Sequence, residues 1–212
     1  MVVKMSDIFY DKERTMWWPY FDHKPKNNWK MIKAGMGAIE VLLPLVPQKS
    51  VCVQAGGHLG YWPNRLAQVF KTVHTFEADP IVYQCLIRNL KGENIKSYSE
   101  ALGSSKCELL LRRGASAGGS KIWPEGDIKV KVVTIDSLNL TACDAIILDI
   151  EGYEIQALEG AIETIKKFSP ILHLEKLDHC ALALDFYIYS IGYEQIAKSG
   201  RDIICRKKGN VI

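Results

Sequence analysis

The segment at residues 144–150, Asp-Ala-Ile-Ile-Leu-Asp-Ile, constrains the fold more than any other part of the chain. It is apolar almost throughout, whereas a strand with one solvated face alternates apolar and polar residues. Such a run is typical of a central parallel strand that is buried on both faces. The segment therefore predicts a parallel sheet with helices packed on both sides.

Strand-like and helix-like segments alternate along the rest of the chain. Short apolar or β-branched runs predict strands at 51–54, 73–77 and 170–176 and a further strand within 95–102, and helical spacing predicts helices at 29–43, 63–70, 80–90, 153–167 and 179–191. Two short strands around Lys198-Ser199-Gly200 predict a closing antiparallel hairpin. Together they predict an α/β fold, a Rossmann-like three-layer sandwich with a seven-stranded, mostly parallel sheet and a C-terminal antiparallel hairpin.

Two segments fall outside this alternation. Residues 1–28 are expected to be irregular, and their Trp17-Trp18-Pro19-Tyr20-Phe21 cluster forms either a packing cap or a ligand-binding wall, with packing favoured. The glycine-rich loop at 113–126, between strands near 107–112 and 128–133, is expected to act as a lid. We expect residues 1–50 to form an N-terminal cap segment and helix, and residues 51–212 to form the ligand-binding domain.

Composition excludes several classes of protein. The chain has 212 residues and a net charge of +3, which argues against a dedicated nucleic-acid binder. No apolar run approaches the roughly 20 residues of a membrane span, and the first residues lack the pattern of a signal peptide. The six cysteines are scattered without a CxxC pair, so we expect reduced thiols and a cytoplasmic protein. Asp136 and Asp144 form no convincing metal cluster with Asp149, and no metal is expected.

A glycine-rich turn joins the first strand of the sheet to the first following helix, in the sequence VCVQAGGHLGY at 51–61. Gly56 and Gly57 let the backbone turn tightly and a ligand approach, and Gly60 allows close helix–strand packing. Glu77 ends the next strand, 21 positions after Gly56. An acid there is placed to bond the hydroxyls of an adenosine ribose. The alternative is a plain strand–helix turn with Glu77 as a surface acid.

The turn also separates two classes of ligand. A dinucleotide site usually needs GxGxxG, so that a helix N-terminus can hold a pyrophosphate. This chain has A-G-G-H-L-G, with the bulky His58 in the turn. That sequence suits a ligand with adenosine and no phosphate, such as S-adenosylmethionine. His58 is a candidate base beside this loop, because the ordinary pKa of histidine lies near 6.5.

Five motifs carry a resemblance to a known family: VQAGGHLGYW (53–62), FEADP (76–80), TIDSL (134–138), LDIEGYEIQALEGA (148–161) and PILHLEK (170–176). The sequence resembles the FkbM-type family of S-adenosylmethionine-dependent methyltransferases from about residue 51 to 176. The Asp-x-Glu-Gly-x-Glu string that begins at Asp149 is the most specific of the motifs.

The resemblance implies a role for several residues. Gly56 and its neighbours would line the methionine part of the cofactor, and Glu77 would hold the ribose. Ala78 and the Glu100-Ala101-Leu102 turn would contact the adenine. Asp149 would face the sulfonium and the acceptor. The set implied as cofactor-binding is Gln54, Gly56, Gly57, Gly60, Glu77, Ala78, Ala101, Leu102 and Asp149, and the candidate catalytic residues are Asp149 and His58.

Two positions depart from the family pattern. The acid usual at the end of the first strand is Gln54 here, and the asparagine usual in the glycine loop is His58. Gln54 can accept a bond from the cofactor's ammonium but supplies no negative charge. This departure motivates one alternative, a catalytically silent binding protein with the same fold. A nicotinamide-dependent oxidoreductase is a second alternative, which the absence of GxGxxG disfavours.

The expected function is methyl transfer from S-adenosylmethionine, with S-adenosylhomocysteine as product, to an oxygen of a small molecule or glycan. The donor is already activated, so the protein's main tasks are alignment and desolvation. The hydroxyl-bearing acceptor and the oligomeric state stay open at this point.

Overall fold

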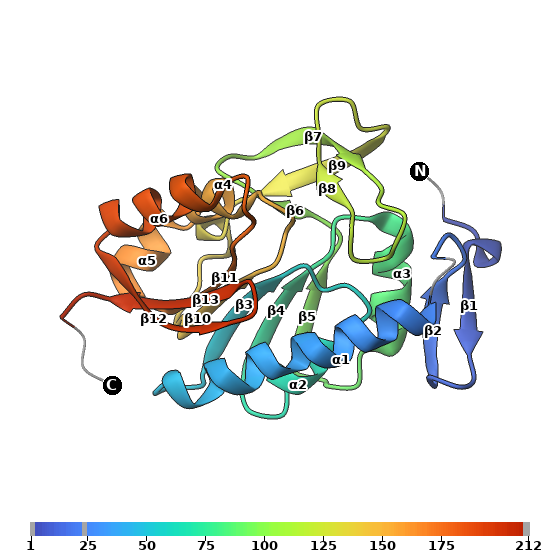
Figure 1. Cartoon of the computed structure of the whole chain (residues 1–212), viewed down its shortest axis with the longest axis horizontal. Helices are drawn as coiled ribbons and strands as arrows, with labels where there is room; N and C mark the ends of the chain where they lie inside the picture. Colours follow the sequence, from blue (N-terminus) through green and yellow to red (C-terminus); the bar gives the residue numbers. More distant parts are fainter. Residues whose placement is uncertain (1–2, 23–24, 210–212) are drawn as a thin grey trace.

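The computed structural model describes residues 3–22 and 25–209 and contains a seven-stranded central sheet (Figure 1). Parts of the predicted 1–28, 1–50 and 51–212 units therefore lie outside the described residues. The strand order is β12-β13-β11-β10-β3-β4-β5. These strands are β3 (Val51–Ala55), β4 (Thr72–Phe76), β5 (Ile95–Tyr98), β10 (Ala145–Leu148), β11 (Ile171–Glu175), β12 (Tyr193–Ser199) and β13 (Asp202–Lys207).

The apolar run within residues 144–150 forms β10, with parallel neighbours β3 and β11 on its two sides. All four of its residues are fully buried. Strands β12 and β13 form the predicted antiparallel hairpin at one edge. The predicted α/β fold with a mostly parallel seven-stranded sheet is thus confirmed. The strand is shorter than the predicted 144–150, because it ends before Asp149.

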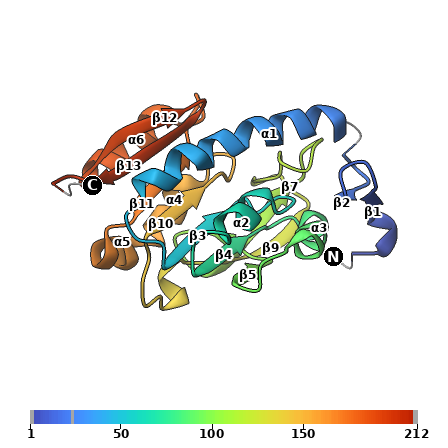
Figure 2. The same ribbon diagram turned by 90° about the horizontal axis from the view of Figure 1, so that it is seen from below.

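Helices cover both faces of the sheet (Figures 1 and 2). On one face, α1 (Pro25–Leu42), η2 (Leu43–Leu45) and α2 (Tyr61–Leu66) pack on alternate residues of β3, β4 and β10. On the other face, α4 (Glu154–Glu159), α5 (Ile162–Phe168) and α6 (Ala181–Ser190) pack on the remaining ones. Helix α3 (Pro80–Asn89) begins after Asp79, whose carboxylate accepts hydrogen bonds from the N–H groups of Ile81 and Val82, as an N-cap does.

A second sheet, which the sequence did not predict, lies above the ends of the central strands. Its order is β6-β9-β7-β8, with β6 (Ala101–Leu102), β7 (Cys107–Arg112), β8 (Lys121–Ile122) and β9 (Ile128–Val133). The strand predicted within 95–102 is β5, but the turn predicted at Glu100-Ala101-Leu102 is wrong, since the chain leaves the central sheet after Tyr98 and Ala101 and Leu102 pair with β9. The turn between them, at 99–100, carries the chain from one sheet to the other.

The single helix predicted at 153–167 is also wrong, since it is broken between α4 and α5. A Cβ atom on Gly160 would lie 2.0 Å from the carbonyl oxygen of Gly103, so the chain passes very close to another backbone here. The Asp136 carboxylate, in the 3₁₀ turn η3 (Asp136–Leu138), then accepts hydrogen bonds from the N–H groups of Glu163 and Thr164 at 3.1 and 2.8 Å. This distant cap starts α5 as a separate helix.

The N-terminal segment is more regular than predicted. After the 3₁₀ turn η1 (Met5–Asp7), strands β1 (Ile8–Asp11) and β2 (Met16–Pro19) form an antiparallel hairpin beside α3 (Figure 1). The Asn89 side chain accepts from the Trp17 N–H at 2.7 Å and donates to its carbonyl at 2.9 Å. Trp18 is fully buried among residues of α3. The aromatic cluster therefore packs the hairpin onto the domain.

Among the described residues, no helix combines the length and the apolar character that crossing a bilayer requires.

Candidate functional site

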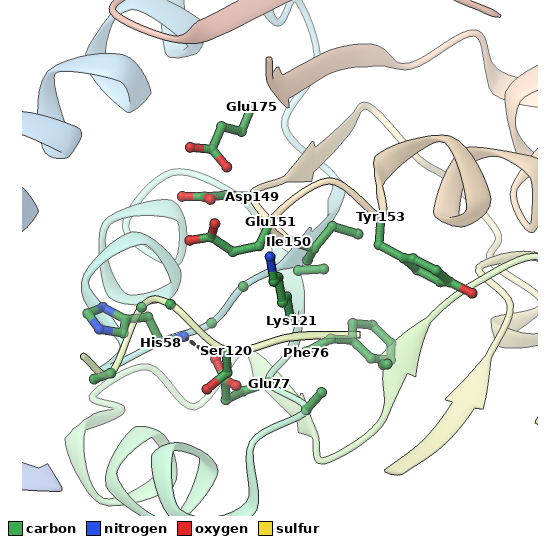
Figure 3. A pocket seen from close by; sticks show the side chains of 18 of the residues that line it. His58, Phe76, Glu77, Ser120, Lys121, Asp149, Ile150, Glu151, Tyr153 and Glu175 are labelled. Carbon is green, nitrogen blue, oxygen red and sulfur yellow. Dashed lines mark hydrogen bonds between the residues drawn. The ribbon is translucent and has the colours of Figure 1, made fainter. Parts of the chain in front are cut away.

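A pocket of about 320 Å³ lies at the carboxyl ends of β3, β4, β10 and β11 (Figure 3). Its floor is made by the residues that follow these strands, and its roof by residues 116–122 of the second sheet and its loop. The carboxyl ends of parallel strands are where open α/β sheets bind ligands. The volume is at the lower end of the range for small-molecule sites.

The glycine loop after β3 is shaped by contacts that exclude any side chain at two positions. Gly56 has φ +81°, and a Cβ atom there would lie 2.0 Å from the carbonyl oxygen of Asp149. A Cβ atom on Gly57 would lie 2.8 Å from Oγ1 of Thr75. Gly60, with φ +93°, is the N-cap of α2. The loop therefore packs closely against β4 and the residue that follows β10.

Most backbone N–H groups of this loop already have partners within the protein. Those of Gly56 and Gly57 both donate to the carbonyl of Phe76, at 3.0 and 2.8 Å. The His58 N–H donates to Oε2 of Glu77 at 2.9 Å, and the Gly60 N–H to the carbonyl of Gly57 at 2.9 Å. A loop that cradles phosphates presents such groups to the ligand. This loop is therefore poorly suited to hold a pyrophosphate.

Glu77 lines the pocket just after β4 and is anchored by backbone. Its Oε1 accepts from the Asp79 N–H and its Oε2 from the His58 N–H, both at 2.9 Å. Burial raises the pKa of Glu77 to about 8, although the two N–H bonds act in the opposite direction. The carboxyl group is thus fixed in place and keeps unused lone pairs for a ligand.

The 113–126 segment covers the pocket and is pinned beside Glu77. Arg113 donates to both oxygens of Asp79 at 2.7 and 2.9 Å, and the Ser120 hydroxyl donates to Oδ2 of Asp79 at 3.0 Å. The Ala117 N–H donates to Asp22, at the end of the N-terminal hairpin region. Residues 116–122 line the pocket, whereas no described residue before Ile32 does. The described part of 1–28 therefore supports the covering segment and does not border the pocket.

His58 lies under this cover. It has φ +50°, a left-handed conformation that is uncommon for a residue with a side chain. Its Nε2 is buried and has no hydrogen-bond partner among the described residues, and a Cβ atom on Gly118 would lie 3.6 Å from it. Burial lowers the pKa of His58 to about 4, so the ring is neutral at pH 7. The imidazole thus faces the covering segment.

Three carboxyl groups gather on the opposite side of the pocket. Figure 3 shows Asp149, Glu151 and Glu175 side by side, with Lys121 directed toward Glu151. Burial raises the pKa of all three, that of Glu175 to about 9. We call Asp149, Glu151 and Glu175 the carboxyl edge, and the loop 56–58 with Glu77 the glycine-loop edge.

The sequence-predicted site residues separate into two groups. Gly56, Gly57, His58, Glu77, Ala78, Ala101, Leu102 and Asp149 all line the pocket. Gln54 and Gly60 do not line it. Gln54 is fully buried behind the loop, where its amide donates to the Gly56 carbonyl at 2.8 Å and its Oε1 accepts from the Thr75 hydroxyl at 2.5 Å. Strand alternation points the Gln54 side chain away from the pocket, and its hydrogen bonds hold the glycine loop on the side opposite the pocket.

Several lining residues were not predicted: Ile32, Tyr61, Trp62, Lys121, Tyr153, Glu175 and Arg201. Glu175 had a detectable signal, because it ends a predicted strand as Glu77 and Asp149 do. Lys121 comes from β8 of the second sheet and Arg201 from the turn between β12 and β13, and the sequence pattern does not give the positions of these segments relative to the pocket. Within the described part of the chain, no group of three or more His, Cys, Asp or Glu side chains is arranged to hold a metal ion.

Comparison with solved structures finds the same fold. The structure of a methyltransferase FkbM from Methylobacillus flagellatus KT aligns with 75% of this chain at 21% identity and a TM-score of 0.55. The alignment covers 43% of that protein, so this chain spans less than half its length. A magnesium protoporphyrin IX methyltransferase from Synechocystis PCC 6803, solved with bound SAM, aligns with 89% of this chain and 94% of its own at 11% identity and a TM-score of 0.49. No curated protein matches the chain.

The family model described as the methyltransferase FkbM domain matches residues 54–193, which is more than half of the chain. The match spans the glycine loop, Glu77 and the carboxyl edge, and it ends at the start of β12. The resemblance stated from the five motifs is therefore confirmed. This chain belongs to the FkbM family of methyltransferases.

Proposed function

We propose that the chain is an S-adenosylmethionine-dependent methyltransferase that methylates a hydroxyl group of a small molecule or glycan. The observation that carries the proposal is the pocket itself, in which a bare glycine turn separates a backbone-anchored glutamate from a carboxyl edge. Bound S-adenosylmethionine would supply an activated methyl group on a sulfonium, so the protein need only align and desolvate the reactants.

The residues fit this cofactor. Gly56 and Gly57 line the pocket without a side chain, which suits the close approach of the methionine part. Glu77 presents a fixed carboxyl group to the ribose hydroxyls. Ala78, Ala101 and Leu102 provide small or apolar surface for the adenine. Asp149 and Glu151 of the carboxyl edge line the pocket where they can offer negative charge to a ligand that carries both a sulfonium and an ammonium.

Asp149 is the residue we assign to the chemistry. It follows the most deeply buried strand, so its backbone is held by the sheet on both sides. Its raised pKa makes it a stronger base than an exposed aspartate, which suits the removal of a proton from a hydroxyl acceptor. His58 is not assigned a role in proton transfer, because its ring faces the covering segment and not the carboxyl edge.

Two observations weigh on the alternatives. The engaged N–H groups of the glycine loop disfavour a nicotinamide dinucleotide, whose pyrophosphate needs free donors. Gln54, the departure that motivated a silent binding protein, lies behind the loop and not in the pocket. The absence of an acid at that position therefore removes no group from the pocket wall.

The experiment is a single-turnover assay with methyl-labelled S-adenosylmethionine and a panel of hydroxyl-bearing acceptors. The proposal expects S-adenosylhomocysteine to form with at least one acceptor. Asp149→Asn should slow transfer by about tenfold or more, as expected when a catalytic base is removed, with little change in melting temperature. Near-native transfer by the Asn variant would contradict the role of Asp149, and cofactor binding without any transfer would favour the silent binding protein.

A further inference from the structure

Glu175 is a pocket residue for which neither the sequence motifs nor the proposed reaction provides a role. It is the last residue of β11, and its neighbours in the sheet explain its surroundings. Leu148 of β10 pairs with Leu174 of β11, so the next residues, Asp149 and Glu175, lie side by side where the two strands end. On its other side Glu175 pairs with Asp202 of β13. Three acids therefore occupy adjacent positions across three strands.

The charged groups around Glu175 are mostly anionic. Asp149 faces it from β10, Glu151 and Glu154 from the following loop and α4, and Asp202 from β13. The cations that share the pocket wall are Lys121 and Arg201, and both act on Glu151. His173, on the same strand, is buried, and its pKa is lowered to about 4, so it is neutral. A second negative charge at Glu175 is therefore strongly opposed.

The Asp149 and Glu175 carboxyl groups lie side by side at the pocket (Figure 3), and their interaction favours a lower pKa for Asp149 and a higher pKa for Glu175. Oε2 of Glu175 is buried and has no hydrogen-bond partner among the described residues. Two carboxyl groups in contact hold one proton between them, because both cannot ionise together at low cost. Burial favours the neutral form of Asp149, and hydrogen bonding from Glu175 is what opposes it.

We propose, on the basis of the proposed function, that Glu175 is a positioning residue: it carries a proton at neutral pH and donates it in a hydrogen bond to Asp149, which keeps that carboxylate ionised and aimed into the pocket. The acceptor side of the site thus depends on a pair of acids and not on Asp149 alone. Loss of the Glu175 proton at alkaline pH would place two anions together and disrupt the pair.

Two substitutions separate this role from simple packing. Glu175→Gln keeps a neutral donor of nearly the same shape but cannot ionise, so methyl transfer should stay within about threefold of the wild type and persist to higher pH. Glu175→Leu removes the donor, so Asp149 should become protonated at higher pH. Its kcat at pH 7 should fall by about tenfold or more, and the acidic limb of its pH–rate profile should move upward. Glu163→Gln, an exposed acid on α5, is the matched control and should change neither.

Carbon-13 NMR of labelled carboxyl groups tests the pair without any turnover. The wild-type protein should show a carboxyl group that titrates near pH 9, and Glu175→Gln should lack it. Its absence from the folded wild-type protein would overturn the inference, as would equal impairment of the Gln and Leu variants. If the titration is present and no acceptor is methylated, the carboxyl pair stands and the proposed function fails.

Discussion

Glu77 and Glu175 occupy equivalent places in the sheet and have different surroundings. Both lie at the carboxyl end of a parallel strand, line the same pocket and have a pKa raised by burial, to about 8 and about 9. Glu77 is held by two backbone N–H groups, which favour its ionised form. Glu175 faces other carboxyl groups, which favour its protonated form. Burial thus raises the pKa of both acids, whereas these partners act on the pKa in opposite directions.

The most severe change should be Gly56→Ala, because it affects both edges at once. Its Cβ atom would lie 2.0 Å from the Asp149 carbonyl oxygen in a backbone conformation with φ +81°. Relief would require the glycine loop to move away from β10, at a cost of about 1–3 kcal/mol or more. We expect a lower melting temperature and loss of S-adenosylhomocysteine binding by calorimetry. Gly37→Ala is the control, because nothing lies within 4 Å of its Cβ atom.

The same amide substitution should have different consequences at the two glutamates. Glu77→Gln places an NH₂ group against one of the N–H donors of His58 and Asp79, and leaves that donor unpaired. An unpaired buried donor costs about 1–3 kcal/mol, and the affinity for S-adenosylhomocysteine should fall by about ten- to a hundredfold. Glu175→Gln should bind S-adenosylhomocysteine with nearly the affinity of the wild type. Equal affinities of the wild type, Glu77→Gln and Glu175→Gln for S-adenosylhomocysteine would contradict the different roles of the glycine-loop edge and the carboxyl edge.

The covering segment is pinned to the glycine-loop edge through Asp79. Arg113→Ala removes two hydrogen bonds to that carboxylate and leaves Ser120 as its remaining partner from the segment. Limited proteolysis should then cut at 114–120 several-fold faster than in the wild type, and added S-adenosylhomocysteine should slow cutting in both. Protection of the segment at the wild-type level in the variant would show that the Asp79 contacts do not hold it.

Stability should fall modestly as the pH rises from about 6.5 to 9. The raised pKa values of Glu77, Glu154, Glu175 and Asp202 mean that the folded state keeps protons that the unfolded chain releases, so their contribution is lost as pH rises. Below about pH 6.5, His58 and His173 have the opposite effect: stability falls as the pH falls, because the unfolded chain binds protons that the two folded rings do not. Melting curves across this range should show the fall, reduced at its alkaline end in Glu175→Gln. A stability that is constant or rises from 6.5 to 9 would count against these buried acids.

Parts of the fold could be predicted because some local sequence patterns are compatible with only one kind of secondary structure. The run at 144–150 and the Asp79-Pro80 start of α3 correspond to a buried strand and a capped helix. The incorrect predictions arise where a contact with a residue distant in sequence determines where an element ends or pairs. The break at Gly160 depends on Gly103, and the second sheet depends on β6 pairing with β9, neither of which is visible in local sequence.

The candidate site shows the same division. Glu77 and Asp149 could be predicted, because a strand end is a local feature and the carboxyl ends of parallel strands meet. Gln54 does not line the pocket, because strand alternation turns its side chain toward Thr75 on the far side of the loop. Lys121 and Arg201 reach the pocket only through the arrangement of the second sheet and the final hairpin. Strand-end acids could therefore be found from sequence, whereas residues brought in by tertiary packing could not.

Calorimetric titration of the purified protein with S-adenosylhomocysteine and, separately, with NAD distinguishes a methyltransferase site from a dinucleotide site. We predict one-to-one binding of S-adenosylhomocysteine, weakened at least tenfold in Glu77→Gln, and no binding of NAD at the same concentrations. Binding of NAD alone, equal affinity for the two ligands, or S-adenosylhomocysteine binding that is indifferent to Glu77 would contradict this prediction.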